Sequence, residues 1–250
     1  MKNVFDLIKK NIAFTLAEIV IVMGIIGVIG VLAVTNARKD TDVAEKVTQL
    51  RKTYQILDAA FSTAVMENGT IDTWGTNGAK PTPAEVWDVM KNYLKFQKVC
   101  GTNSGCWKSG NQYGIDGEES STNIDDSGLL PKAILSNGVS ITIGIFLDHG
   151  DDENVKEAYD ILVDVNGIKG LNTYGNDIFG FTVTNEGVIK PVSLSMYYPY
   201  PTKSGGAIGG IPNCKIIGVY CTGWVLKFGN MDYLKNCADQ LDWNTKTTCK

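Results

Sequence analysis

A long apolar stretch near the N-terminus dominates the hydrophobic pattern of the chain. It covers the 21 residues from Phe14 to Val34 and contains one charged side chain, that of Glu18. About 20 apolar residues are enough for a helix to cross a bilayer. Further along, apolar residues recur three and four positions apart, as in an amphipathic helix, at Val43, Val47, Leu50, Tyr54, Leu57, Phe61 and Val65. We therefore predict one helix over 14–67, about 80 Å long at a rise of about 1.5 Å per residue, which ends at the stop signal Asn68-Gly69.

After this helix the pattern changes to shorter elements. Thr82, Pro83 and Glu85 have the spacing of a capping box with proline at the first helical position, which predicts a second, short helix. Four later segments are rich in β-branched and aromatic residues, which is typical of strands: 139–147, 159–165, 178–184 and 188–192. Short turns between them favour antiparallel pairing. The predicted fold is α+β, with the long hydrophobic N-terminal helix packed on a small antiparallel β-sheet.

The pattern divides the chain into three parts. Residues 1–13 form a basic leader, residues 14–67 form the long helix, which we expect to span the membrane to about residue 35, and residues 68–250 form an exported globular α+β domain. Basic residues before an apolar span lie on the cytoplasmic side. The expected localisation is therefore a single pass through the inner (cytoplasmic) membrane, with the C-terminal domain in the periplasm or outside the cell.

The order of residues at the start of the apolar stretch differs from that of an ordinary secretory signal. Such a signal has its small-residue cleavage site after the apolar core, whereas Ala13 precedes the core here. A cut between Ala13 and Phe14 would create an α-ammonium about one helical turn from Glu18. The two charges could then pair within one subunit or with a neighbour. The alternative is an uncleaved signal anchor, in which Glu18 lies near the membrane interface without a special role.

The run Ala13-Phe14-Thr15-Leu16-Ala17-Glu18 and the valines, isoleucines and glycines after it resemble the class III signal of type IV pilins and type II secretion pseudopilins. In that family a prepilin peptidase cuts before the phenylalanine and methylates it, and the glutamate guides subunit docking. The resemblance assigns these roles to Phe14 and Glu18, with Ala13 in place of the more usual glycine. It implies a structural subunit, a minor pilin or a pseudopilin, of a type IV pilus or a type II secretion filament.

The same resemblance implies a set of partners. These are the prepilin peptidase, other pilin or pseudopilin subunits, the inner-membrane assembly platform and the lipid bilayer, and after assembly the protein lies in a pilus or pseudopilus. Two other functions stay open: a binding module displayed on a filament, for adhesion or DNA uptake, and a membrane-tethered exported enzyme. The chain has no G-x-S-x-G, P-loop or H-E-x-x-H motif, so we expect no enzyme. Its net charge of −4 gives no basic footprint for nucleic acid, and none is expected as a partner.

The six cysteines all follow residue 99, in the part that we expect to be exported: Cys100, Cys106, Cys214, Cys221, Cys237 and Cys249. An even number in an oxidising compartment favours disulfides. Nearness in sequence suggests the pairs Cys100–Cys106, Cys214–Cys221 and Cys237–Cys249, although six cysteines allow about 15 pairings. The alternative is that some of the thiols are simply buried.

Acidic residues concentrate in the middle of the chain. Between Asp116 and Glu186 there are 14 acidic residues and 3 lysines, a balance that suits a solvated face, a cation site or a docking surface for a basic partner. One segment in this region carries several oxygen donors between glycines, which suits Ca²⁺, through Asp164, Asn166, Asn172 and Asp177. The segment also resembles a C-terminal loop with which some pseudopilins bind calcium. The alternative is a turn in which Asp and Asn side chains bond to their own backbone.

Overall fold

The computed structural model describes residues 16–121, 123–144, 159–192, 214 and 218–249. Two compact units make up the chain, Met1–Asp42 and Val43–Lys250. The first helix, α1 (Leu16–Asn68), contributes residues to both units. Two further α-helices are α2 (Pro83–Met90) and α5 (Thr222–Phe228). Short 3₁₀ helices are η2 (Ile71–Trp74), η3 (Thr76–Gly78), η4 (Gly218–Cys221), η5 (Asp232–Leu234) and η6 (Ala238–Gln240).

The fold class predicted from the sequence is wrong in its helix, and so is the localisation that depended on it. α1 has 53 residues, but it is not one apolar stretch, because Arg38, Lys39, Asp40 and Asp42 follow its apolar part. Within the described ranges no helix is long and apolar enough to span a membrane. The predicted span began at Phe14, which lies outside the described residues. The predicted single pass through the inner membrane is therefore contradicted, and the structure supports an α+β fold with an antiparallel sheet.

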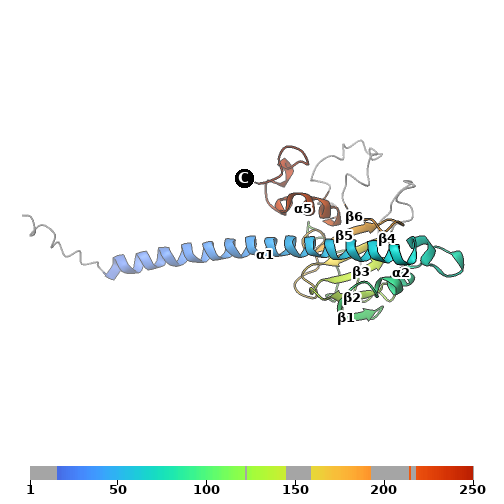
Figure 1. Cartoon of the computed structure of the whole chain (residues 1–250). Helices are drawn as coiled ribbons and strands as arrows, with labels where there is room; N and C mark the ends of the chain where they lie inside the picture. The colour runs from blue at the N-terminus through green and yellow to red at the C-terminus, as the bar shows by residue number, and fades with distance from the viewer. Residues whose placement is uncertain (1–15, 122, 145–158, 193–213, 215–217, 250) are drawn as a thin grey trace, which may run out of the picture. The chain divides into compact units, whose positions relative to one another are not determined.

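The sheet of the second unit has six strands in the order in which they occur along the chain, and every neighbouring pair is antiparallel (Figure 1). The strands are β1 (Phe96–Gly101), β2 (Lys132–Leu135), β3 (Ser140–Gly144), β4 (Tyr159–Asp164), β5 (Ile178–Val183) and β6 (Ile189–Pro191). The sequence pattern had indicated β3 to β6 and missed β1 and β2. The pair β4–β5 has an unbroken register from Tyr159↔Val183 to Asp164↔Ile178.

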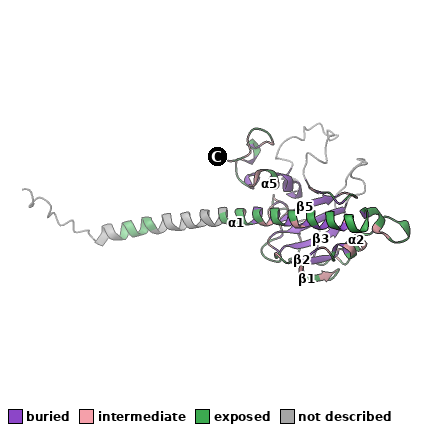
Figure 2. Ribbon diagram, in the orientation of Figure 1, coloured by how far each residue is buried: buried purple, intermediate pink, exposed green. Residues whose placement is uncertain are grey.

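The second part of α1 supplies one side of the core of this unit. Its apolar residues at spacings of three and four put Leu50, Leu57 and Phe61 on one face, where all three are fully buried. Tyr54, on the same face, stacks on Phe181 of β5 with ring centroids 5.8 Å apart. Figure 2 shows the strands mostly buried and the opposite side of this part of α1 exposed. The predicted amphipathic helix thus packs its apolar stripe on the sheet, which is the main source of its stability.

The capping box predicted at the start of the second helix is confirmed. The Thr82 hydroxyl accepts from the Glu85 backbone N–H at 3.3 Å, and the Glu85 carboxylate accepts from the Thr82 N–H at 2.8 Å. The same carboxylate also accepts from the Thr76 hydroxyl at 2.8 Å. These hydrogen bonds lower the pKa of Glu85 to about 2, with the Thr82 N–H as the largest cause. The box therefore fixes both the start of α2 and the turn before it.

A long loop, 102–131, is organised by one buried lysine. Lys132, at the start of β2, is fully buried. Its Nζ donates to four backbone carbonyls of the loop, those of Thr102 (3.1 Å), Ile124 (3.2 Å), Asp125 (2.8 Å) and Ser127 (2.6 Å). Burial lowers the pKa of Lys132, while the nearby carboxylates of Asp125 and Asp126 oppose that shift. A loop with little secondary structure of its own is thus held in place by a charge-assisted network.

All six cysteines form disulfides. The bonds are Cys100–Cys106, Cys214–Cys221 and Cys237–Cys249, with Cα–Cα distances of 6.0, 4.9 and 5.8 Å. These are the pairs that nearness in sequence had suggested. Each one closes a short loop, so the bonds fix local turns more than they join distant parts of the domain.

Candidate cation site at the β4–β5 connection

The predicted calcium residues lie in the connection between β4 and β5. Asp164 ends β4 and faces Ile178 at the start of β5, and the Val165 N–H donates to the Asp177 carbonyl at 3.0 Å. This pairing brings Asp164 and Asp177 to the same end of the strand pair. The chain turns at Gly167, which has a φ of 67° and whose Cβ, if present, would lie 2.6 Å from the Gly138 carbonyl oxygen. Glycine is therefore required at this position.

Several oxygen atoms of this cluster are buried and lack hydrogen-bond donors. Asp164 is 0% exposed, and Asn172 and Asp177 are each 2% exposed. Among the described residues, no donor forms a hydrogen bond to Asp164 Oδ2, Asn166 Oδ1 or Asn172 Oδ1, whereas Asp177 Oδ1 faces the Lys46 ammonium at 3.0 Å. Three of the four residues predicted from the sequence thus contribute a buried oxygen without a hydrogen bond, and the fourth, Asp177, contributes a buried oxygen that is paired with an ammonium. Such groups are rare in folded proteins, and a bound ion or water is a common reason for their presence.

The turn that was the alternative interpretation is also present. The Asn166 N–H donates to Asp164 Oδ1 at 3.1 Å, and the Gly167 N–H donates to the Asp164 carbonyl at 3.1 Å. Asp164 therefore uses one carboxylate oxygen to stabilise its own turn. Its other oxygen, Oδ2, remains for a different partner. The turn and a cation site are compatible with each other, because they use different atoms.

Lys46 of α1 is a charged member of this cluster that sequence reasoning missed. Its Nζ forms an ion pair with Asp177 Oδ1 at 3.0 Å and donates a hydrogen bond to Asn176 Oδ1 at 3.2 Å. The lysine side chain is 10% exposed and the Asp177 side chain 3%. Lys46 and Asn176 are 130 positions apart in the sequence, so only the fold brings them together. The available signal was a lysine next to Val43 and Val47, on the face of the helix that turns toward the sheet.

The charges of the cluster do not balance. Burial is the largest cause that raises the pKa of Asp164 well above its usual value, and the Asp177 charge raises it further. Burial also raises the pKa of Asp177, while the Lys46 ammonium opposes that shift. Two buried carboxylates thus share one ammonium. The site needs a further positive charge, either a proton on a carboxyl group or a bound cation.

The donor set suits calcium better than a transition metal. Calcium takes about six to eight oxygen ligands from carboxylates, amides, carbonyls and water. The four oxygens, of which Asp177 Oδ1 is paired with Lys46, come from two carboxylates and two side-chain amides. No group of three or more His, Cys, Asp or Glu that could hold a metal lies in the described part of the chain. Asp164, Asn166, Asn172 and Asp177 could hold Ca²⁺ only with backbone carbonyls or water as further ligands.

The residues predicted for processing and assembly are only partly described. Ala13 and Phe14 lie outside the described residues, as does the acidic run 148–153. Glu18 lies in the first turn of α1, two positions after its first residue. The expected proximity of Glu18 and the amine of a processed Phe14 therefore rests on their spacing in the sequence alone.

Comparison with known proteins adds no relative to this picture. No family model, no curated protein and no solved structure matches the chain. Any statement about its function therefore rests on its own residues and their geometry.

Proposed function

We propose that the chain is a prepilin-like structural subunit, a minor pilin or pseudopilin of a type IV pilus or type II secretion filament. The proposal begins from the order Ala13-Phe14-Thr15-Leu16-Ala17-Glu18, in which the cleavage motif precedes the apolar residues. A prepilin peptidase is the proposed processing enzyme, and other subunits are the proposed partners. The role is architectural and not catalytic.

The exposed apolar part of α1 is the observation that carries this proposal. Between positions 20 and 26 all apolar side chains larger than alanine are 50% to 70% exposed: Val20, Ile21, Val22, Met23, Ile25 and Ile26. Seven successive helical residues cover about two turns, hence every side of the helix. Apolar surface of this extent is normally covered by another molecule. We propose that the same helices of neighbouring subunits cover it.

The first test is the mature N-terminus. If a prepilin peptidase processes the chain, intact-mass and peptide mass spectrometry should find Phe14 at the N-terminus, with the mass of one added methyl group. The control is the same chain in a strain that lacks the prepilin peptidase, where Met1 should remain and no methyl group should be added at Phe14. Isolation of the chain with Met1 intact, from cells that process another prepilin, would contradict the proposal.

We also propose that the unit Val43–Lys250 binds Ca²⁺ through Asp164, Asn166, Asn172 and Asp177. The buried oxygens without donors support this, together with the deficit of one positive charge. Lys46 supplies an ammonium to the same carboxylate, Asp177, and so is expected to compete with the ion. The role of the ion would be to fix the β4–β5 connection, as a ligand that binds only the folded state stabilises that state.

Chelation gives the second test. A ligand at about 100 times its Kd contributes about 2.7 kcal/mol, which corresponds to a change in Tm of roughly 5–10 °C for a domain of this size. EDTA should lower the Tm of calcium-loaded protein by that amount, as measured by circular dichroism. Asp164→Ala should remove the sensitivity, whereas Asp58→Asn, at an exposed position of α1, should keep it.

The substitution Lys46→Met tests whether a bound ion or a bound proton supplies the missing positive charge at this site. Loss of the ammonium should tighten calcium binding, measured by isothermal titration calorimetry, because a competing positive charge is removed. If a proton and not an ion completes the site, the same variant should show no calcium binding and a lower Tm, since Asp177 would lose its buried partner. If adding calcium to the metal-free wild-type protein released or absorbed no heat, the calcium site would be excluded and only the turn interpretation would remain.

A further inference from the structure

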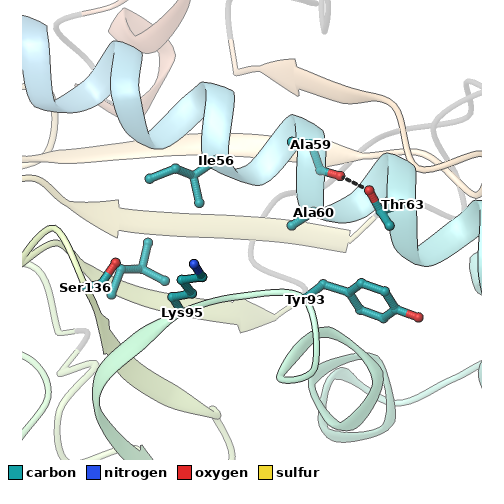
Figure 3. Close-up of a pocket in the computed structure, with 8 residues that line it drawn as sticks. Ile56, Ala59, Ala60, Thr63, Tyr93, Lys95 and Ser136 are labelled. Atoms are coloured by element: carbon teal, nitrogen blue, oxygen red, sulfur yellow. Dashed lines mark hydrogen bonds between the residues drawn. The ribbon is translucent and has the colours of Figure 1, made fainter.

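A hollow of about 370 Å³ opens beside the second part of α1. α1 contributes Ile56, Ala59, Ala60 and Thr63 to its lining, and Leu135 at the end of β2 lines it as well. The residues from α1 include two alanines, which leave room next to the helix. Figure 3 shows the Lys95 side chain with its amine directed toward α1. The hollow is therefore apolar with one cationic group at its edge.

The hydroxyl groups of Thr63 and Tyr93, which also line the hollow, have partners. The Thr63 hydroxyl donates to the Ala59 carbonyl at 2.8 Å, and the Tyr93 hydroxyl donates to the Glu67 carboxylate at 2.8 Å. Lys95 is exposed, and its ammonium has no hydrogen-bond acceptor or carboxylate partner within the described ranges. A molecule that fits the hollow would therefore be small and would carry a negatively charged hydrogen-bond acceptor for the Lys95 ammonium.

One described loop of the same chain has these properties. It is a tight turn in which the Gly114 N–H donates to the Glu118 carbonyl at 2.8 Å and the Gly117 N–H donates to the Gly114 carbonyl at 3.1 Å. Asp116, Gly117 and Glu118 at its tip are exposed. Asp116 Oδ1 accepts from the Glu118 N–H at 3.1 Å, whereas the Glu118 carboxylate has no partner in the described part of the chain. The tip is narrow and ends in a free carboxylate.

This turn, which we name the Glu118 turn (114–119), is held away from the hollow of its own chain. Tyr113 joins it to the β4–β5 connection, through hydrogen bonds from the Tyr113 N–H to the Asn172 carbonyl (2.8 Å) and from the Tyr174 N–H to the Tyr113 carbonyl (2.9 Å). α1 reaches that connection at Lys46. The hollow begins about ten residues later on α1, which is about 15 Å further along the helix axis. The two features therefore lie at different positions along α1.

We propose that the Glu118 turn of one copy docks into the hollow of a second copy, with Glu118 paired to Lys95. Opposite charges without partners in their own chain, one on a narrow tip and the other beside a small hollow, are complementary. The contact joins two different surfaces of the subunit, so it is heterologous. If the rotation between successive copies does not close a ring, the same contact repeats along an open filament. The inference rests on the proposed function, because it supplies a lateral contact between the globular domains of a filament.

Charge reversal in the full chain tests the contact. Ala59 lines the hollow and is exposed, so a photo-crosslinking residue placed there should react with residues 114–119 of another copy. Mixing isotope-labelled and unlabelled chains shows by mass spectrometry that the product joins two copies. Lys95→Glu and Glu118→Lys should each lower the crosslink yield about tenfold, and the double variant should return it to within about twofold of wild type. The matched control is Lys91→Glu, because Lys91 is already paired with Asp88 at 2.7 Å.

The outcomes separate the contact from the proposed function. The crosslink is measured in sheared filaments and in the purified full chain. Filaments whose crosslinks map to another segment, or to a different protein, overturn the inference and leave the proposed function standing. If the wild-type chain never enters filaments, the proposed function is overturned. The contact is then tested in the purified chain, where the crosslink supports it and absence of the crosslink overturns it. Equal crosslink yields from wild type and both single variants would also overturn it.

Discussion

Replacing Glu18 by alanine should lower the amount of the protein in filaments about tenfold, equivalent to about 1.4 kcal/mol of docking free energy. If a prepilin peptidase cuts before Phe14, helical spacing would place the new ammonium about one turn from Glu18. The apolar residues that follow, Val20 to Ile26, leave this amine without another nearby carboxylate on the helix. Removing Glu18 would therefore bring an unpaired charge into an apolar contact between subunits, which is costly.

The measurement compares the protein in sheared filaments with the total in the cells, for wild type and variant. Processing should not change, since Glu18→Ala leaves Ala13 and Phe14 intact. Glu45→Ala is the matched control, because Glu45 is an exposed carboxylate of the same helix that lies in the second unit. Equal incorporation of Glu18→Ala and wild type would remove the assembly role from this residue.

Replacing Lys132 by methionine should lower the free energy of unfolding by about 3 kcal/mol. Methionine keeps much of the shape of the side chain but leaves four loop carbonyls without their shared donor. Each buried carbonyl without a donor carries a desolvation cost. Urea denaturation followed by tryptophan fluorescence measures the loss, and the buried Trp107 of the same loop reports on it.

Lys108→Met is the control for Lys132→Met. Lys108 lies in the same loop but is exposed, so its substitution should change the free energy of unfolding by less than about 0.5 kcal/mol. Equal effects of the two substitutions would show that the loop does not depend on the buried ammonium. A loss confined to Lys132→Met, with the disulfides intact by mass spectrometry, would assign the stabilisation to the carbonyl network.

The periodic parts of the fold could be predicted, because their signal is local. The spacing of Leu50, Leu57 and Phe61 fixes which face of α1 is buried, and Thr82 with Glu85 fixes the start of α2. The prediction failed where the apolar character of one segment was used to infer the localisation of the whole chain. An apolar run was taken as a membrane span, although no helix of the described residues meets the length and apolar character of one.

β1 and β2 were missed for a related reason. β1 is an edge strand with three exposed and three partly buried residues, so it lacks the apolar alternation of a half-buried strand. β2 has four residues and begins with a buried lysine. Both strands are stabilised by pairing with each other and with β3, which is information that a short sequence window does not contain.

By itself, the sequence determined features whose residues are close together in the chain: the order of motif and apolar residues at Ala13 to Glu18, the disulfide neighbours and the oxygen-rich turn at Asp164. The tertiary structure alone decided which charges meet. It brought Lys46 to Asp177 and Lys132 to its four carbonyls, and it left Lys95 beside an open hollow. The physical reason is range. Periodicity and turn chemistry act over a few residues, whereas burial of a charge depends on every element packed around it.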